Sequence, residues 1–313
     1  MTDLPLTTGL DPDDPHGYAA IARATATFAE QTGRLDEAGA WAGRQFVGRY
    51  FICGFGNAAQ RAMLLPLLSR GEALIAIAIS EPGVGAHPKH LATRAEPDGD
   101  GVRITGRKAW VTNGPTATHF IVLAISEIVE GRKRYSAYLL PRDTPGLSVQ
   151  PMPELADGRH CILVLDGCCL TDSARLGPAG RAYEAMALPL RDAEDAVELS
   201  KLTGALRFVM RRLAMRTMSP DAELALGGMM ALIAVLAEGA TALADALDAG
   251  ALVRHGARLV GLRLLVAELA RRIREQDGAA DVAAVLREID LAMSIARGPR
   301  EARQRRLVEP LRQ

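Results

Sequence analysis

The hydrophobic periodicity of the sequence changes twice, and this limits the chain to a mixed fold with separate helical and strand regions. Residues 17–69 are rich in helix formers, and Asn57 is placed to cap a helix over residues 58–68. After Gly71 the chain turns to short apolar runs separated by turn sequences. From Ala182 onward helical spacing returns. The order helix, strand, helix predicts an α+β chain of several parts.

The middle region is predicted to be a β domain, with an antiparallel, barrel-like arrangement of strands. Asp98-Gly-Asp-Gly101 and Asn113-Gly114 are turn sequences between apolar runs, and such turns join neighbouring antiparallel strands. The strand segments expected from apolar runs are Ala73–Ile79, Val102–Thr105, Phe120–Ala124, Tyr135–Leu140 and Cys161–Leu165.

The C-terminal region is predicted to form a four-helix bundle. Its helical stretches cover residues 183–216, 221–248, 251–274 and 281–311. The predicted domains are therefore an N-terminal helical region (1–72), the β domain (73–178) and the bundle (179–313).

Composition argues against several partners. The chain has 37 Lys and Arg residues against 37 Asp and Glu, and aromatic residues make up only 4% of it, so a nucleic-acid partner is not expected. The apolar run Leu224–Ala237 is shorter than the ~20 residues that span a bilayer. We therefore expect a buried core helix there and no membrane span.

The four cysteines match neither a zinc pattern nor a redox pair, so no metal is predicted and the thiols are expected to be buried or free. Residues 1–15 lack the basic and apolar stretches of a signal peptide. A reducing, cytoplasmic location is the expectation.

Charge is segregated between two of the predicted helices. The stretch 221–248 carries five acidic residues and no basic one, whereas 251–274 carries six arginines and one glutamate. Opposite signs suit pairing within the bundle or across a subunit contact. Two solvated faces are the alternative.

Three motifs in order carry a resemblance to a known family. The upstream run is Gly54-Phe-Gly-Asn-Ala-Ala-Gln60, the strand and loop run is Ala76-Ile-Ala-Ile-Ser-Glu-Pro-Gly-Val-Gly-Ala-His87, and the third motif is Gly106-Arg-Lys-Ala-Trp-Val-Thr-Asn-Gly114. Together they resemble the acyl-CoA dehydrogenases, and the chain is identified as a divergent, shortened member of that family.

The resemblance implies FAD and an acyl-CoA or acyl-carrier thioester as ligands. A flavin needs backbone N–H donors, small residues near its phosphates and a flat surface against its ring. The family's flavin-lining positions fall on residues of the last two motifs, and the alternative for each is an ordinary strand residue. These positions are Ile77, Ile79, Ser80, Gly85, Trp110 and Thr112. Ala86 stands where the family has a serine expected to bond cofactor or acyl ligand.

The implied reaction removes an α-proton with a glutamate while the β-hydrogen passes to the flavin. One family position for this base falls on Ala193, so the neighbouring Glu194 is the candidate after a one-residue shift. A charged helix face is the alternative for Glu194. The second family position falls on Arg297, which cannot act as a base.

The cofactor-anchoring motifs of the family's bundle are altered here. Arg216-Thr-Met-Ser219 lacks the Phe-Gly that follows the arginine in the family, and Gly227-Gly228 is interpreted as close helix packing. Three hypotheses follow. The first is an active FAD-dependent acyl-CoA dehydrogenase of fatty acid metabolism, or an oxidase or monooxygenase relative. The second is a non-catalytic subunit that completes the flavin site of a catalytic paralogue, and the third is a ligand-binding or carrier-protein interaction module without a flavin. A homo- or hetero-oligomer is expected from the resemblance.

Overall fold

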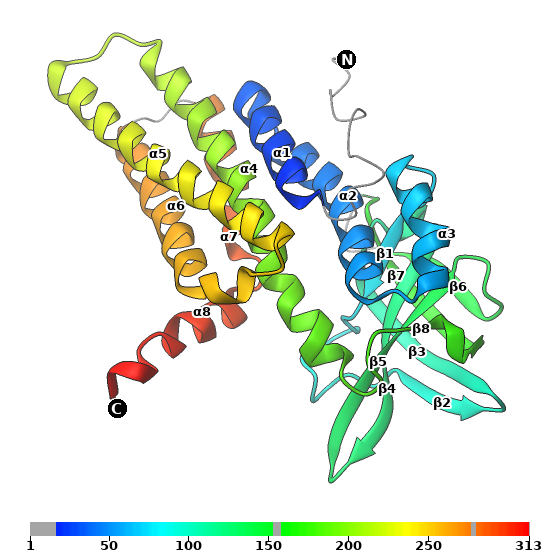
Figure 1. The fold of residues 1–313 in the computed structure, drawn as a ribbon. Coiled ribbons are helices and arrows are strands. Elements are labelled where there is room, and N and C mark those ends of the chain that lie inside the picture. The colour runs from blue at the N-terminus through cyan, green and yellow to red at the C-terminus, as the bar shows by residue number, and fades with distance from the viewer. Residues whose placement is uncertain (1–16, 153–157, 277–279, 313) are drawn as a thin grey trace. The chain divides into compact units, whose positions relative to one another are not determined.

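A computed structural model describes residues 17–152, 158–276 and 280–312 of the chain. Helices precede and follow a strand-rich middle segment, and the predicted α+β architecture is confirmed (Figure 1). The helices are α1 (Tyr18–Thr32), α2 (Leu35–Phe55), α3 (Ala58–Ser69), α4 (Leu188–Ala214), α5 (Pro220–Asp248), α6 (Gly256–Gln276), α7 (Ala280–Ser294) and α8 (Arg297–Arg306). The strands are β1 (Ile75–Ala78), β2 (Arg94–Asp98), β3 (Gly101–Thr112), β4 (His119–Val129), β5 (Arg132–Pro141), β6 (Leu147–Pro151), β7 (His160–Thr171) and β8 (Arg175–Leu176). Short helical turns cover Gly114–Thr116, Asp172–Ala174, Tyr183–Ala187, Leu252–His255 and Glu309–Arg312.

The chain packs as two compact units. The helical unit contains residues 17–43 and the described residues from 191 onward, and the strand unit contains the described residues between 44 and 190. Helix α1 belongs to the helical unit because the backbone N–H groups of Tyr18 and Ala19 donate to the Asp248 carboxylate of α5 at 2.8 and 2.9 Å. The three predicted domains were drawn in chain order, and that division remains a prediction.

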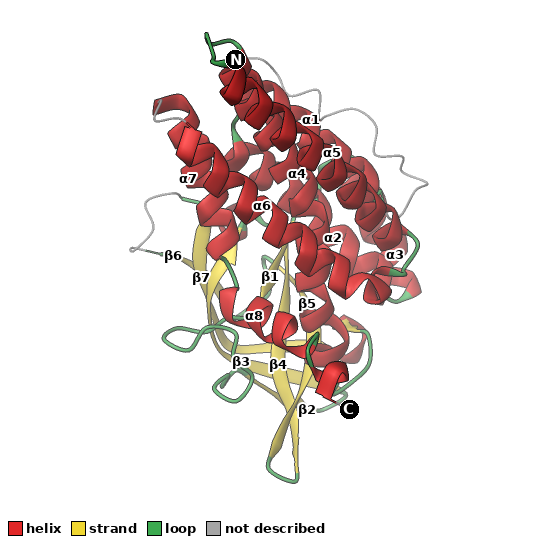
Figure 2. Cartoon of the chain, turned by 90° about the vertical axis from the view of Figure 1, so that its left-hand side faces the viewer, coloured by secondary structure: helices red, strands yellow, loops and turns green. Residues whose placement is uncertain are grey.

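The strands form one sheet in the order β6-β7-β3-β2-β4-β5-β8, with β1 added beside β4 (Figure 2). Most pairings are antiparallel, as predicted, but β1 and β2 each run parallel to β4. The path ends at β6 and β8, so the barrel-like sheet is not a closed barrel. Strand β1 can run parallel to β4 because a loop and the β2–β3 hairpin carry the chain back between them.

Turn and cap residues act where the sequence predicts. Asp98 pairs with Gly101 at the end of the β2–β3 hairpin, and Gly99 between them has a φ of 57°, which glycine adopts readily. At the start of α3 the Asn57 side chain accepts the Gln60 N–H, and the Gln60 side chain accepts the Asn57 N–H, both at 2.9 Å. This reciprocal capping box confirms the predicted helix start.

The last predicted helical stretch is two helices, which corrects the expectation of one helix over residues 281–311. Helix α7 ends at Ser294, Ala296 has a φ of 53°, and α8 begins at Arg297. Pro299 has no N–H to donate to a preceding turn, and it is accommodated in the first turn of α8, where such donors are not needed.

The expectation of a buried core helix at Leu224–Ala237 is wrong, because most of the surface of this helix is exposed. Helix α5 buries one stripe that includes Met229, Ile233 and Leu236, whereas Leu224 and Val235 are 78% and 57% exposed. In its most apolar window only 22% of residues are buried. By length and composition α5 is apolar enough to cross a membrane, which is weak evidence because core helices pass the same test. The absence of a span stays a prediction.

One further expectation for this region is corrected. A Cβ added at Gly227 or Gly228 would meet nothing within 4 Å, so these glycines do not serve close helix packing inside the chain. Of the alternatives for the two charged helices, pairing within the bundle is not found, because among the described ion pairs none joins α5 to α6. Arg271 pairs within α6, Arg274 pairs with Asp290 of α7 and Arg263 pairs with Asp195 of α4.

The cysteines behave as the sequence predicts. Cys161 and Cys168 are buried in the sheet core, and Cys169 is exposed. Burial raises the pKa of the Cys161 thiol to about 11, so this thiol stays protonated at neutral pH.

Candidate functional site

Trp110 exposes its indole and has a strained backbone. Its side chain is 51% exposed and its φ is 59°. The β3–β7 register changes here: Lys108 pairs with Leu163 and Val111 with Cys161, so β3 carries one additional residue. A bulge redirects a side chain out of the ladder, and a left-handed backbone costs a bulky residue ~1–3 kcal/mol. Such an exposed and strained aromatic residue is typical of a ligand-binding surface.

The end of β1 meets β3 beside Trp110. The Ala109 N–H donates to the Ser80 carbonyl at 2.9 Å, which places Ser80 next to the residue that precedes Trp110. Ile77 is a half-buried residue of β1, whereas Ile79 follows the end of the strand and packs against the cluster of Leu91, Ile125 and Tyr135. The structure thus places Ser80 beside the part of β3 that carries Trp110 and Thr112.

The other two predicted residues of this unit lie in the loop after Ser80. Glu81 and Gly85 exchange backbone hydrogen bonds of 3.0 and 3.1 Å, which closes a tight turn. Gly85 has a φ of 62° and open space around it, so the backbone conformation, not crowding, favours glycine. Ala86 is exposed, and its carbonyl accepts a hydrogen bond from the Tyr183 hydroxyl at 3.1 Å.

A buried ion pair fixes this loop to β3. Lys108 Nζ lies 2.8 Å from Glu81 Oε1, and the two side chains are 0% and 7% exposed. Lys108 also donates to the Ile79 carbonyl at 3.1 Å. The Glu81 carboxylate accepts the backbone N–H groups of Ala92 and Thr93 at 2.7 and 3.0 Å. One carboxylate therefore ties both ends of the 79–93 loop to the strand that carries Trp110.

The opposite charges of the pair offset part of the effect of burial on the pKa of each group. Burial alone would raise the pKa of Glu81, but the charge of Lys108 and hydrogen bonds from Lys108 and Thr93 lower it. Burial lowers the pKa of Lys108, and Glu81 opposes that effect. Sequence reasoning missed this pair, although both residues lie inside the quoted motifs. The sequence signal that could have revealed the pair is one charged residue in each motif, Glu81 in the second and Lys108 in the third.

The outer part of the loop is held by β5. The Tyr135 hydroxyl donates to the Pro88 carbonyl, and Lys133 Nζ donates to the Lys89 and Leu91 carbonyls at 2.8 and 2.6 Å. These contacts use side-chain donors from one strand, so they orient the loop without a regular ladder.

Glu194, the predicted base, lies on α4 in the helical unit. Its carboxylate is 2.8 Å from Arg191, and the two side chains are 31% and 34% exposed. Loss of hydration raises the pKa of Glu194, and Arg191 opposes this. Ala193 and Asp195 on either side are each 1% exposed. The segment is thus not only a solvated charged face, because the carboxylate of Asp195, which follows Glu194, is buried.

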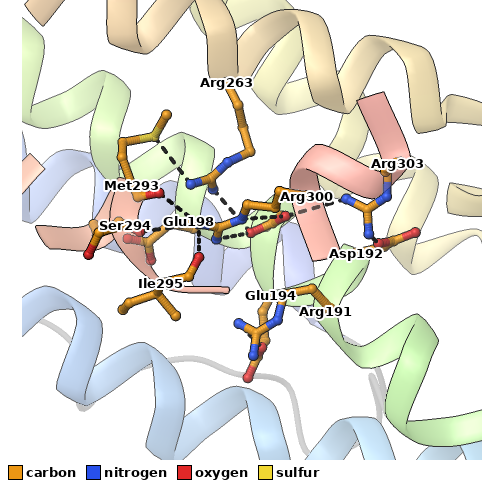
Figure 3. A network of polar contacts seen from close by, with 12 residues as sticks. Arg191, Asp192, Glu194, Glu198, Arg263, Met293, Ser294, Ile295, Arg300 and Arg303 are labelled. Atoms are coloured by element: carbon orange, nitrogen blue, oxygen red, sulfur yellow. Dashed lines mark hydrogen bonds and ion pairs between the residues drawn. The ribbon is translucent and has the colours of Figure 1, made fainter. Parts of the chain in front are cut away.

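Asp195 is the centre of a polar network (Figure 3). Its carboxylate lies 3.0 Å from Arg263 of α6, and it accepts the Arg300 Nε–H of α8 at 3.2 Å. Arg303 of α8 is 3.6 Å from the same carboxylate. Arg300 also donates to the Met293 carbonyl at the end of α7 at 3.2 Å. This role was not predicted, because Asp195 stands in a run of charged residues.

Arg297 occupies the first position of α8 and is not part of a buried site. Its side chain is 80% exposed and its Nε lies 2.7 Å from Glu301. A guanidinium remains protonated near neutral pH, so Arg297 cannot abstract a proton.

The strand-unit surface fits a planar aromatic cofactor better than a metal. It offers an exposed indole, aliphatic strand side chains and a glycine turn with an open approach. Within the described parts of the chain, no group of three His, Cys, Asp or Glu side chains is placed to hold a metal ion.

Sequence comparison finds relatives of the strand unit. The profile of the acyl-CoA dehydrogenase middle domain matches residues 76–168. A mitochondrial isovaleryl-CoA dehydrogenase of Oryza sativa is 34% identical over 134 residues, which cover 42% of this chain and 33% of that protein. A cyclohexane-1-carbonyl-CoA dehydrogenase of Syntrophus aciditrophicus is 35% identical over 105 residues, 34% of this chain and 27% of that protein. The match spans about a third of these curated relatives.

Structural comparison extends the similarity to almost the whole fold. A putative acyl-CoA dehydrogenase of Mycobacterium smegmatis has a TM-score of 0.75 at 19% identity, covering 97% of this chain and 83% of that one. Butyryl-CoA dehydrogenase of Megasphaera elsdenii has a TM-score of 0.71 at 17% identity, covering 95% and 89%. At this identity the likeness concerns the fold.

Replacing Lys108 with Met should destabilise the strand unit by about 3–5 kcal/mol, because Glu81 would remain buried without its partner. Arg103→Met is the matched control on the same strand. Arg103 pairs with Asp98 in an exposed pair, whose loss should cost less than about 1 kcal/mol. Urea unfolding of the three proteins measures both values. Equal effects of the two substitutions would contradict the structural role of the buried pair.

Proposed function

The chain is a member of the acyl-CoA dehydrogenase family, and from this premise we propose that it binds FAD and oxidises an acyl thioester between its α and β carbons. The observation that carries the proposal is Trp110, held exposed and strained at the β3 bulge beside the end of β1. Bound FAD would supply the acceptor for the β-hydrogen.

Each predicted residue has a role suited to its place. Trp110 offers a flat face for the flavin ring, and the two half-buried isoleucines, Ile77 and Ile79, offer aliphatic contact. Ser80 and Thr112 bring hydroxyl groups, and Gly85 brings open backbone. Ala86 lacks the hydroxyl found in the family, which removes a hydrogen bond of about 0.5–1.5 kcal/mol.

For the base we propose Glu194. A carboxylate with a raised pKa is a better proton acceptor near neutral pH than an ordinary one. It would take the α-proton of the thioester, carried by CoA or by a carrier protein. The second candidate function is a non-catalytic subunit that completes the flavin site of a catalytic paralogue, and Arg297 at the other family position favours it. The cytoplasmic location remains a proposal that rests on cysteine usage.

We further propose that α5 contacts a second copy of the chain. Between Glu223 and Glu238 this helix carries no charge, and its outward positions include Leu224 and Val235. The exposed glycines at 227 and 228 permit close approach of another helix. An exposed apolar face of this kind marks an interaction surface.

Replacing Trp110 with Gly should weaken FAD binding about tenfold or more, because loss of ring stacking costs ~1–3 kcal/mol. Glycine also relieves the positive φ, so the fold should be retained. Trp41→Phe, on α2, removes the other tryptophan and should leave affinity unchanged. FAD titration monitored by flavin absorbance gives the affinities. Absence of saturable FAD binding by the wild-type protein, alone or with a co-expressed paralogue, would refute the flavin proposal.

Replacing Glu194 with Gln should lower kcat by about 10²–10⁴ with an acyl-CoA panel and an artificial electron acceptor. In the wild type kcat/KM should rise with pH through the raised pKa of Glu194, since only the ionised carboxylate accepts the proton. The control is Glu198→Gln, on the same helix and paired with Lys201. Unchanged turnover in Glu194→Gln would remove this residue from the reaction. A flavin-loaded wild type without turnover would favour the non-catalytic subunit.

Replacing Val235 with Glu should dissociate an oligomer, because a charge would be buried without a partner in the α5 contact. Val253→Glu is the control, at a position 87% exposed outside α5. Sedimentation velocity reports the mass of each protein. A wild-type monomer at micromolar concentration would contradict the α5 contact.

A further inference from the structure

The helical unit contains a cavity that the proposed flavin and base residues do not use. It lies between α6, α7 and α8 and has a volume of about 440 Å³. Sites for small organic ligands fall between ~300 and 1,000 Å³. The cavity is therefore large enough for a compact ligand.

One wall of the cavity is apolar. It is formed by Leu259, Leu264 and Ala267 of α6 and by Met293 of α7. Leu264 is 50% exposed although it faces this hollow. Covering such a wall with an alkyl chain removes apolar surface from water, which favours binding.

The remaining lining is polar, and its four arginines outnumber its two carboxylates, Asp290 and Glu301. Arg263, Arg297, Arg300 and Arg303 all line the cavity, and the Arg263 side chain is only 7% exposed. Burial lowers the pKa of Arg263 to about 10, so the group still carries its charge at neutral pH.

The charges at the base of the cavity do not cancel. Arg263, Arg300 and Arg303 meet two carboxylates, Asp192 and Asp195 (Figure 3), which leaves one positive charge in excess. At the rim, the Arg297–Glu301 and Arg274–Asp290 pairs are neutral. Arginine forks suit a planar carboxylate.

We propose that this cavity binds an amphipathic monoanion, an alkyl chain that ends in one carboxylate. The chain lies along the α6 and Met293 wall, and the carboxylate faces the arginines. Neither Glu194 nor the predicted flavin residues line this cavity, so the proposal stands apart from the proposed dehydrogenation.

Isothermal titration calorimetry with octanoate tests the proposal on the full chain. We expect saturable binding of octanoate, and at least tenfold weaker binding of octanol, which lacks the charge, and of inorganic phosphate, which lacks the chain. No saturable binding of octanoate, or equal binding of octanol or phosphate, overturns the proposal.

Octanoate could also bind an acyl site elsewhere in the chain. Variants are therefore needed to show that it binds in this cavity. Ala267→Trp fills the cavity and should abolish binding, whereas Ala257→Trp, exposed on the same helix outside the cavity, should preserve it. Arg297→Gln should weaken binding about threefold to tenfold. Arg305→Gln should have no effect, because Arg305 also pairs with Glu301 but does not line the cavity. Circular dichroism verifies that each variant is folded. Binding that persists in folded Ala267→Trp overturns the assignment.

Discussion

The Glu81–Lys108 pair determines how the candidate flavin surface is built. Taking two charges out of water is costly, and the cost is offset only when every remaining donor and acceptor is used. Here the carboxylate accepts from Ala92 and Thr93 as well as from the ammonium, and the ammonium also reaches the Ile79 carbonyl. The loop and the bulged strand cannot move apart without exposing these groups or leaving them unpaired. The strain at Trp110 is held by this connection.

The helical unit also contains a buried network of charged side chains, but there the cations outnumber the anions. In the strand unit one cation meets one anion, whereas Asp195 meets three arginines from α6 and α8. The network joins the end of α7 to α8 through Arg300, so it also sets the direction of the chain after the break at Ala296. Arg303 also pairs with Asp192, so three arginines face two carboxylates and one positive charge remains in excess.

The sequence predicted local features better than long-range ones. The Asn57 cap, the Gly99 turn and the strand at β1 follow from residues that are neighbours in the chain. The six predicted flavin-lining positions came from motif resemblance, and the contact between the two motifs is the Ser80 to Ala109 hydrogen bond. The exposure of α5 was missed because the sequence of an apolar helix does not show whether its own chain or another chain covers it. The buried role of Asp195 was missed because its arginine partners come from α6 and α8, far along the chain.

The parallel pairing of β1 with β4 has a consequence for the order of folding. Ile75 lies opposite His119, and the Leu74 N–H donates to the Thr118 hydroxyl at 3.0 Å, so β1 is joined to residues 44 positions away. The β2–β3 hairpin forms from adjacent residues, but β1 has no place in the sheet until β4 is present. Loop closure over such a separation is entropically unfavourable and slows the step. The candidate surface beside Trp110 is thus expected to assemble late, after the hairpin that carries its aromatic ring.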